Sequence, residues 1–214
     1  AADVGDLKRV LTNVKTRGTW GEVQLAALLE QMLVPGQFAR NVVTVPGSSE
    51  RVEFAIRLPG LRDDQPVWLP IDAKFPREDY ERLLAAQDAA DPVGAEAALR
   101  QLGVRLRDEA RTIRQKYLAP PQTTDFAILF LPTEGLYAEA VRRPGLVDTL
   151  QREHRVVIAG PTTLAAILSS LQMGFRTLAV EKRSSEVWQV LGAVKTEFGK
   201  FGDVLARTRE QLER

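Results

Sequence analysis

Val67-Trp-Leu-Pro-Ile-Asp-Ala-Lys74 is the segment around which the rest of the chain can be organised. It is short and largely apolar, as expected of a buried strand, but its last residues include the charged Asp72 and Lys74. Side chains two residues apart on a strand project from the same face. We therefore expect a carboxylate and an ammonium group to project together from this strand.

Two further strands are expected just before this segment, from Phe38 to Val45 and from Arg51 to Leu58. They are rich in Val and Ile and are separated by turn-forming Pro-Gly sequences. A helix is expected from Trp20 to Leu33, where Pro35 and Gly36 end it. If the strand from Arg51 to Leu58 lies beside the central segment, Glu53 reaches the same place as its two charges.

Helices and buried strands alternate in the second half of the chain. This alternation predicts an α/β fold with a mixed sheet and long flanking helices, not an all-α bundle. The expected elements are a helical stretch from Arg77 to Tyr117 broken near Asp91-Pro92, a strand from Asp125 to Leu131, a helical stretch from Leu136 to Leu150 broken at Pro144-Gly145, a strand from Arg155 to Ala159, and helices from Thr162 onward.

Three parts of the chain are expected: an N-terminal helix over residues 1–16, an α/β core over 17–180, and a C-terminal helix over 181–214. Apolar residues recur in the last part at heptad-like spacing, from Leu191 to Leu212. One interpretation is that both terminal helices pack on the core or on each other. The alternative is a coiled coil that pairs with another chain, which would make the protein a homo-oligomer through its terminal helices.

Glu53, Asp72 and Lys74 suit metal-assisted hydrolysis of a phosphodiester. Mg²⁺ is typically held by one or two carboxylates and takes phosphate oxygens and waters as its other ligands. A nearby lysine can stabilise developing charge or orient the attacking water. Glu22, just inside the first core helix, supplies a further carboxylate. An Asp-x-Lys triplet alone is weak support, because chance gives one in about half of chains this long; its plain interpretation is a surface ion pair.

The composition narrows the partners and cofactors. The 214 residues carry a formal net charge of +1, so any contact with DNA must come from a local basic patch. The absence of cysteine excludes disulfides, thiol catalysis and cysteine-based zinc sites. There is no Walker loop and no Gly-x-Gly-x-x-Gly, so no small-molecule cofactor is expected.

Thr133 and Glu134 are interpreted as a helix cap with an acidic first turn, not as catalytic groups.

Several ordered blocks of the chain resemble those of the RmuC family, and together they cover nearly its whole length. The blocks are Arg17-Gly-Thr-Trp-Gly-Glu-Val-Gln-Leu25, Ile71-Asp-Ala-Lys-Phe-Pro76, Asp125-Phe-Ala-Ile-Leu-Phe-Leu-Pro-Thr-Glu134, Gly160-Pro-Thr-Thr-Leu164, Leu171-Gln-Met-Gly-Phe-Arg176 and Val194-Lys-Thr-Glu-Phe198. The resemblance implies a restriction-endonuclease-like fold of the PD-(D/E)xK class and a role in DNA recombination. It also implies a cytoplasmic protein, anchored at the inner membrane by an N-terminal segment that precedes this sequence.

The resemblance assigns roles to individual residues. Asp72 and Lys74 match the (D/E)xK half of the motif, and Glu22 matches the Glu of the Trp-Gly-Glu block. Glu53 departs from the pattern, because family members usually have Pro-Asp where this chain has Val52-Glu53. The expected activity is a DNA nuclease that uses Mg²⁺ or Mn²⁺ held by Glu53 and Asp72. The rival is a non-catalytic DNA-binding or assembly module that retains the fold.

Four residues are candidates for contact with DNA. Arg17, Lys182 and Arg183 are cations at the ends of expected elements, where phosphate contacts are common, and Gln24 follows the Trp-Gly-Glu block. The alternative for the three cations is a solvated helix end. A real site further requires Glu53, Asp72 and Lys74 to converge in a concave opening wide enough for a nucleic-acid strand.

Overall fold

The computed structural model describes residues 14–62 and 65–178, without side-chain positions for residues 14–19 and 60–64. Backbone contacts divide the chain into two compact units, Ala1–Leu168 and Ser169–Arg214, and the sheet belongs to the first. Most of the expected N-terminal helix and the heptad-like seam lie outside the described residues, as do Lys182 and Arg183. The described part of the second unit is helical, because a helix runs through residues 161–178.

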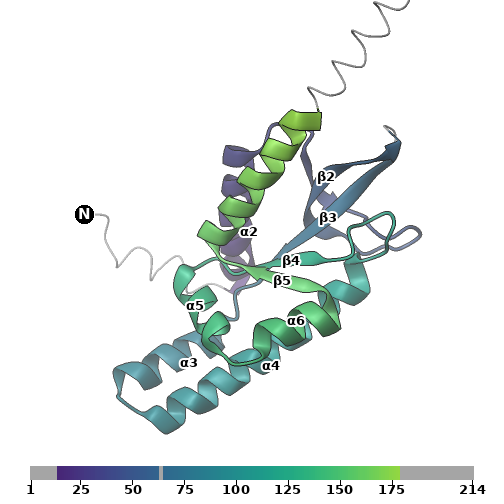
Figure 1. The fold of residues 1–214 in the computed structure, drawn as a ribbon. Coiled ribbons are helices and arrows are strands. Elements are labelled where there is room, and N and C mark those ends of the chain that lie inside the picture. The colour runs from purple at the N-terminus through teal and green to yellow at the C-terminus, as the bar shows by residue number, and fades with distance from the viewer. Residues whose placement is uncertain (1–13, 63–64, 179–214) are drawn as a thin grey trace, which may run out of the picture. The chain divides into compact units, whose positions relative to one another are not determined.

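A five-stranded mixed sheet forms the centre of the first unit (Figure 1). Its spatial order is β1-β2-β3-β4-β5, the same as the order along the chain. β1 with β2 and β2 with β3 are antiparallel, whereas β3 with β4 and β4 with β5 are parallel. The bounds are β1 Phe38–Val42, β2 Val52–Arg62, β3 Gln65–Ala73, β4 Ala127–Phe130 and β5 Val156–Ala159. The mixed α/β class expected from the sequence is confirmed.

Helices lie on both faces of the sheet, with α2 on the side opposite to α3, α4 and α6 (Figure 1). The bounds are α2 Val14–Met32, α3 Arg77–Asp88, α4 Pro92–Tyr117, α5 Glu134–Arg142 and α6 Leu146–His154. The breaks expected at Asp91-Pro92 and at Pro144-Gly145 separate α3 from α4 and α5 from α6. None of the described helices is long and apolar enough to cross a bilayer.

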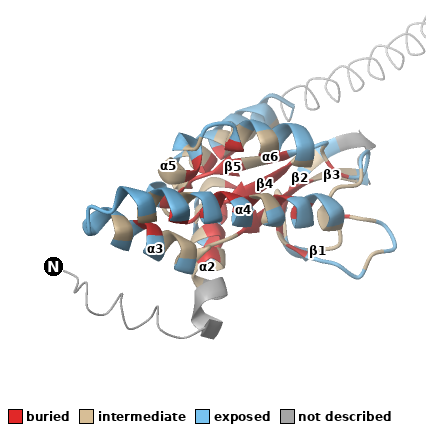
Figure 2. Ribbon diagram, turned by 90° about the horizontal axis from the view of Figure 1, so that it is seen from below, coloured by how far each residue is buried: buried red, intermediate tan, exposed pale blue. Residues whose placement is uncertain are grey.

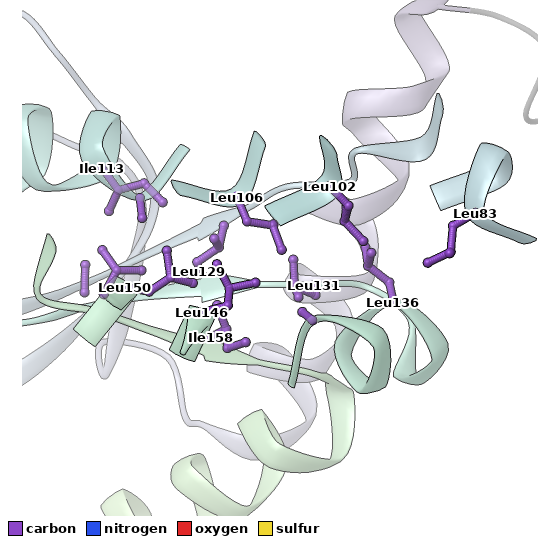
Figure 3. Close-up of a cluster of buried hydrophobic side chains, with 14 of the residues drawn as sticks. Leu83, Leu102, Leu106, Ile113, Leu129, Leu131, Leu136, Leu146, Leu150 and Ile158 are labelled. Atoms are coloured by element: carbon purple, nitrogen blue, oxygen red, sulfur yellow. The ribbon is translucent and has the colours of Figure 1, made fainter. Parts of the chain in front are cut away.

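The main hydrophobic core lies between the sheet and α4. Buried residues of α4 recur at three- and four-residue steps, so one side of this long helix faces the sheet and the other faces solvent (Figure 2). Leu102, Leu106 and Ile113 of α4 meet Leu129 of β4 and Ile158 of β5 (Figure 3). Alternate residues of β4, including Ile128, are buried on the other face of the sheet.

The helix starts are fixed by side chains that accept backbone hydrogen bonds. The Thr133 hydroxyl accepts from the Leu136 N–H at 3.2 Å and caps α5, which confirms the cap expected there. The adjacent Glu134 carboxylate accepts from the Thr162 N–H at 2.6 Å, at the start of the next helix but one. Glu134 therefore ties two helix N-termini together, and this structural role accounts for it.

Candidate active site

β2 and β3 pair in a register that places Glu53 opposite Asp72. The hydrogen-bonded pairing of Phe54 with Ile71 and of Ala55 with Pro70 fixes this register, and Glu53 lies one residue further along. Directly opposed residues of an antiparallel pair share a face. The Ala73 N–H also donates to Glu53 Oε2 at 3.3 Å, which draws the carboxylate toward the end of β3. The convergence expected from the sequence is therefore present.

Asp72 is buried and has one close partner. Asp72 is 1% exposed, and its Oδ2 lies 2.7 Å from Lys74 Nζ. This contact is an ion pair without good hydrogen-bond geometry, because Oδ2 is a buried oxygen that no described residue satisfies with an aligned hydrogen bond. A buried carboxylate oxygen in this state is costly unless a further positive group completes its surroundings.

The three charged groups shift one another's protonation. Burial raises the pKa of Glu53 to about 7, and the nearby Asp72 carboxylate adds to the rise. Burial also raises the pKa of Asp72, and the Lys74 ammonium only partly opposes it. Burial alone would lower the pKa of Lys74, but the Asp72 carboxylate outweighs it and the net shift is upward. Lys74 is therefore fully charged at neutral pH, whereas Glu53 titrates near pH 7.

A cavity of about 220 Å³ opens above the pair of strands. Glu22, Glu53 and Lys74 line it, and α4 contributes Arg105 and Glu109. Asp72 is not among the lining residues, because it lies beneath them. The cavity is smaller than the roughly 300–1,000 Å³ of pockets for drug-sized ligands. Its size suits an ion with its waters and one phosphate group, not a whole duplex.

The start of α2 is held against the end of β3. The Trp20 ring packs on the Phe75 ring with centroids 5.5 Å apart. This contact, together with Gly21 beside Ala73 and Pro132, brings Glu22 to the cavity wall. Glu22 is close enough for its charge to raise the pKa of Glu53 further. The contact between Trp20 and Phe75 therefore anchors the start of α2.

The donor set fits a divalent cation with two protein carboxylates. Glu53 and Asp72 are hard oxygen donors, and the buried Asp72 Oδ2 has an ion-pair partner but no aligned hydrogen bond, so a cation could still bind it. Within residues 14–62 and 65–178, no three His, Cys, Asp or Glu side chains lie together closely enough to hold a metal ion. Glu22 therefore does not form a three-carboxylate cage with the other two, and any remaining ligands must come from water, backbone or substrate.

The residues expected to contact DNA lie in different places relative to the cavity. Arg17 lies in α2, but its side chain is outside the described positions. Gln24 is half-buried and does not line the cavity. The structure adds Arg105, which the sequence analysis missed. Arg105 flanks the buried stripe of α4, and its Nε lies 3.5 Å from the Glu109 carboxylate. The helical spacing of that stripe indicates which side of α4 faces the sheet, but it does not show that Arg105 reaches the cavity.

Comparisons with known proteins agree on one family. The profile of the RmuC family matches residues 1–214. A DNA recombination protein RmuC homolog of Xylella fastidiosa is 61% identical over 99% of this chain and 47% of its own length. A homolog of the same name from Chlamydia muridarum is 31% identical over 86% of this chain and 41% of its own. The Escherichia coli DNA recombination protein RmuC is 29% identical over 73% of this chain and 33% of its own.

The chain thus spans about half the length, or less, of these curated relatives. No solved structure matches the chain significantly.

Proposed function

The chain belongs to the RmuC family, and on that premise we propose that it is the catalytic core of a Mg²⁺- or Mn²⁺-dependent DNA nuclease with a restriction-endonuclease-like fold. The relatives are named as DNA recombination proteins, which supports DNA as the substrate. The proposal concerns this core, because the chain corresponds to about half of the longer relatives or less.

One observation carries the proposal: Glu53 and Asp72 oppose each other on neighbouring strands, with Lys74 beside them at a small cavity. A surface ion pair, the plain interpretation of Asp-x-Lys, would not place the aspartate at 1% exposure. The pair also lies beside a cavity that the Glu53 and Lys74 side chains line, which a structural ion pair does not require. Buried, mutually perturbed charges beside a cavity are typical of functional sites.

Glu53 and Asp72 would hold the divalent cation. When bound, the metal neutralises charge on the phosphate and lowers the pKa of an attacking water. The elevated pKa of Glu53 fits this role, because a cation favours the ionised carboxylate and displaces its proton.

Lys74 contributes as a cation. Its raised pKa keeps the ammonium charged, and an ammonium only donates hydrogen bonds. It is therefore suited to hold a phosphate oxygen or the attacking water, and not to remove a proton from that water. Arg105 lines the same cavity and supplies a second cation for the phosphate backbone.

The test is cleavage of labelled single-stranded, double-stranded and branched DNA by the wild type and by Asp72→Asn. We expect metal-dependent cutting by the wild type, none with EDTA and none by the variant. A circular dichroism spectrum shows whether the variant is folded. If the wild type binds DNA in a salt-sensitive manner and never cuts it, the nuclease proposal is wrong and the module is one for binding or assembly.

A further inference from the structure

A second, larger cavity of about 510 Å³ lies at the start of β3, at the other end of this strand from Asp72. The loop after β1, the start of β3 and the loop between α4 and β4 form its walls. Its lining includes the indole of Trp68, the amides of Gln65 and Gln122, the prolines Pro66 and Pro121, and Thr44. None of its lining residues carries a charge, in contrast to the smaller cavity, whose lining includes five charged side chains.

Trp68 projects from the same face of the sheet as the candidate catalytic residues. It lies four residues before Asp72 on β3, and even steps along a strand preserve the face. At about 3.3 Å per residue the two positions are about 13 Å apart, a span that a few nucleotides bridge at about 3.4 Å per stacked step. Arg57 pairs with Trp68 across β2 and β3, as Glu53 opposes Asp72. Arg57 is exposed and places a cation beside the indole.

The end of α4 connects the two cavities. The Thr44 hydroxyl, which lines the larger one, donates to the Tyr117 carbonyl at 2.8 Å. Tyr117 is also near the active site, because the Asp72 carboxylate adds to the burial that raises the pKa of its phenol. Lys116 pairs with Glu50 at 3.1 Å, and its charge is close enough to Asp72 to lower the pKa of that carboxyl. A strand that passes from one cavity to the other therefore crosses polar groups and a cation.

We propose that the cavity around Trp68 binds an unpaired nucleobase of the DNA strand whose backbone occupies the active site. An uncharged pocket does not suit a phosphate, but an indole stacks on the flat face of any base. Side-chain amides are suited to the donor and acceptor groups on base edges. The cations at Arg57 and Lys116 lie where the connecting phosphates would run.

This inference rests on the proposed nuclease and adds a substrate class to it. A base enters the pocket only after it has left its partner and its stack, so the substrate presents single-stranded DNA close to the cut. Flaps, gaps and unpaired ends have such a segment, whereas an intact duplex does not. Binding through stacking is tolerant of sequence.

Binding is tested with the 214-residue chain carrying Asp72→Asn, in EDTA, so that no DNA is cut. The probes are a short labelled thymidine oligonucleotide and an oligomer of the same length made of abasic deoxyribose phosphates. We expect the thymidine oligomer to bind more tightly. Adding Trp68→Ala should weaken its binding about tenfold and leave the abasic oligomer unaffected. Trp68→Phe, which keeps a ring, should restore most of the affinity.

The matched control is Val93→Ala, which removes an apolar side chain that is 77% exposed at the start of α4. It should change neither affinity. Equal losses for both oligomers in Trp68→Ala would overturn the proposal, because they would indicate a structural or electrostatic effect. So would unchanged binding of both. If a proline-rich peptide bound the protein only when Trp68 was present, and the Trp68 variants bound DNA normally, the cavity would be assigned to a protein ligand instead.

A second measurement uses the protein with Trp68 intact, so that its result does not depend on whether a Trp68 variant folds. A thymidine analogue activated by light should crosslink to Trp68 or to a neighbouring wall of the cavity, and mass spectrometry locates the adduct. Adducts found only elsewhere contradict the inference. The nuclease proposal and this inference can fail separately. If binding depends on the bases but the wild type does not cleave DNA, the nuclease proposal is wrong and the base-binding subsite stands. If the wild type cleaves DNA but binding does not depend on the bases, the nuclease stands and the subsite is wrong.

Discussion

Lys74 Nζ lies 2.7 Å from Asp72 Oδ2 and is the close positive partner of a carboxylate that is otherwise shut away from water. The two residues are unequal, because the Lys74 side chain is 31% exposed and that of Asp72 only 2%. Loss of the carboxylate leaves a lysine that can reach solvent. Loss of the lysine leaves a buried charge.

Lys74→Ala should therefore destabilise the fold more than Asp72→Asn does. At neutral pH we expect Lys74→Ala to lower the free energy of unfolding by about 2 kcal/mol and Asp72→Asn by less than about 1 kcal/mol. Urea denaturation of both variants and of the double variant measures this. The double variant should be more stable than Lys74→Ala alone. Additive losses would mean that the pair does not interact energetically.

Glu53 should make the stability of the metal-free protein depend on pH. Its pKa is about 7 in the folded protein against 4.5 for an ordinary glutamate, so the folded state binds more protons between these values. Its contribution to stability therefore falls as the pH rises from about 4.5 to about 7 and is constant above that. Glu53→Gln, which resembles the protonated form, should be more stable than wild type at pH 8 in EDTA, and the difference should shrink toward pH 5. A difference that does not change with pH would contradict this assignment.

Divalent metal should stabilise the wild type through Asp72. Mn²⁺ at about 100 times its Kd adds about 2.7 kcal/mol to the folded state. For a chain of this size the Tm should rise by about 5–10 °C, measured by thermal unfolding with and without Mn²⁺. Asp72→Asn should lose most of the shift. An equal shift in that variant would place the metal elsewhere.

Arg105→Ala should weaken DNA binding and reduce its dependence on salt. Loss of one phosphate contact lowers the slope of log affinity against log salt by about 0.7–0.9. Arg100→Ala is the matched control, since both arginine side chains of α4 are 59% exposed and both pair with a glutamate four residues away. Arg100 does not line the cavity. The same change in slope for both variants would remove the special role of Arg105.

Glu134→Ala should affect stability and not metal binding. Its carboxylate accepts from the Thr162 N–H and lies in the first turn of α5, so its loss should lower the free energy of unfolding by about 1–2 kcal/mol. The rise in Tm with Mn²⁺ should be unchanged. If that rise disappears in a folded variant, Glu134 belongs to the metal site and the interpretation as a cap is wrong.

Much of the fold was predictable because local patterns and tertiary structure agree. Short runs rich in Val and Ile, separated by Pro-Gly turns, predicted β2 and β3. Asp91-Pro92 predicted the start of α4, where the Asp91 carboxylate accepts from the Gly94 N–H at 2.9 Å. The ends of elements were less accurate: β4 is Ala127–Phe130, shorter than the apolar run that contains it. Strand pairing stops before the apolar sequence does.

The site was predictable in part for the same reason. The spacing of Asp72 and Lys74 fixed their shared face, and a neighbouring strand was enough to bring in Glu53. The burial of Asp72 was not predictable, since it depends on how segments distant in the sequence pack over the strand. Arg105 and Glu109 were missed because their approach depends on the rotation of α4 about its axis. The link from Glu134 to Thr162 joins segments 28 residues apart, beyond the range of local patterns.

The pairing of β2 with β3 shifts its register between Leu58 and Arg62, and the irregularity stays at the far end of the hairpin. Lengthening or shortening the hairpin there leaves Glu53 opposite Asp72. One residue inserted between Glu53 and Leu58 would instead turn the glutamate to the face where Phe54 and Ile56 now lie. Relatives can therefore differ in length at this end of the hairpin, and a tag or probe can be inserted there, without moving Glu53 away from Asp72.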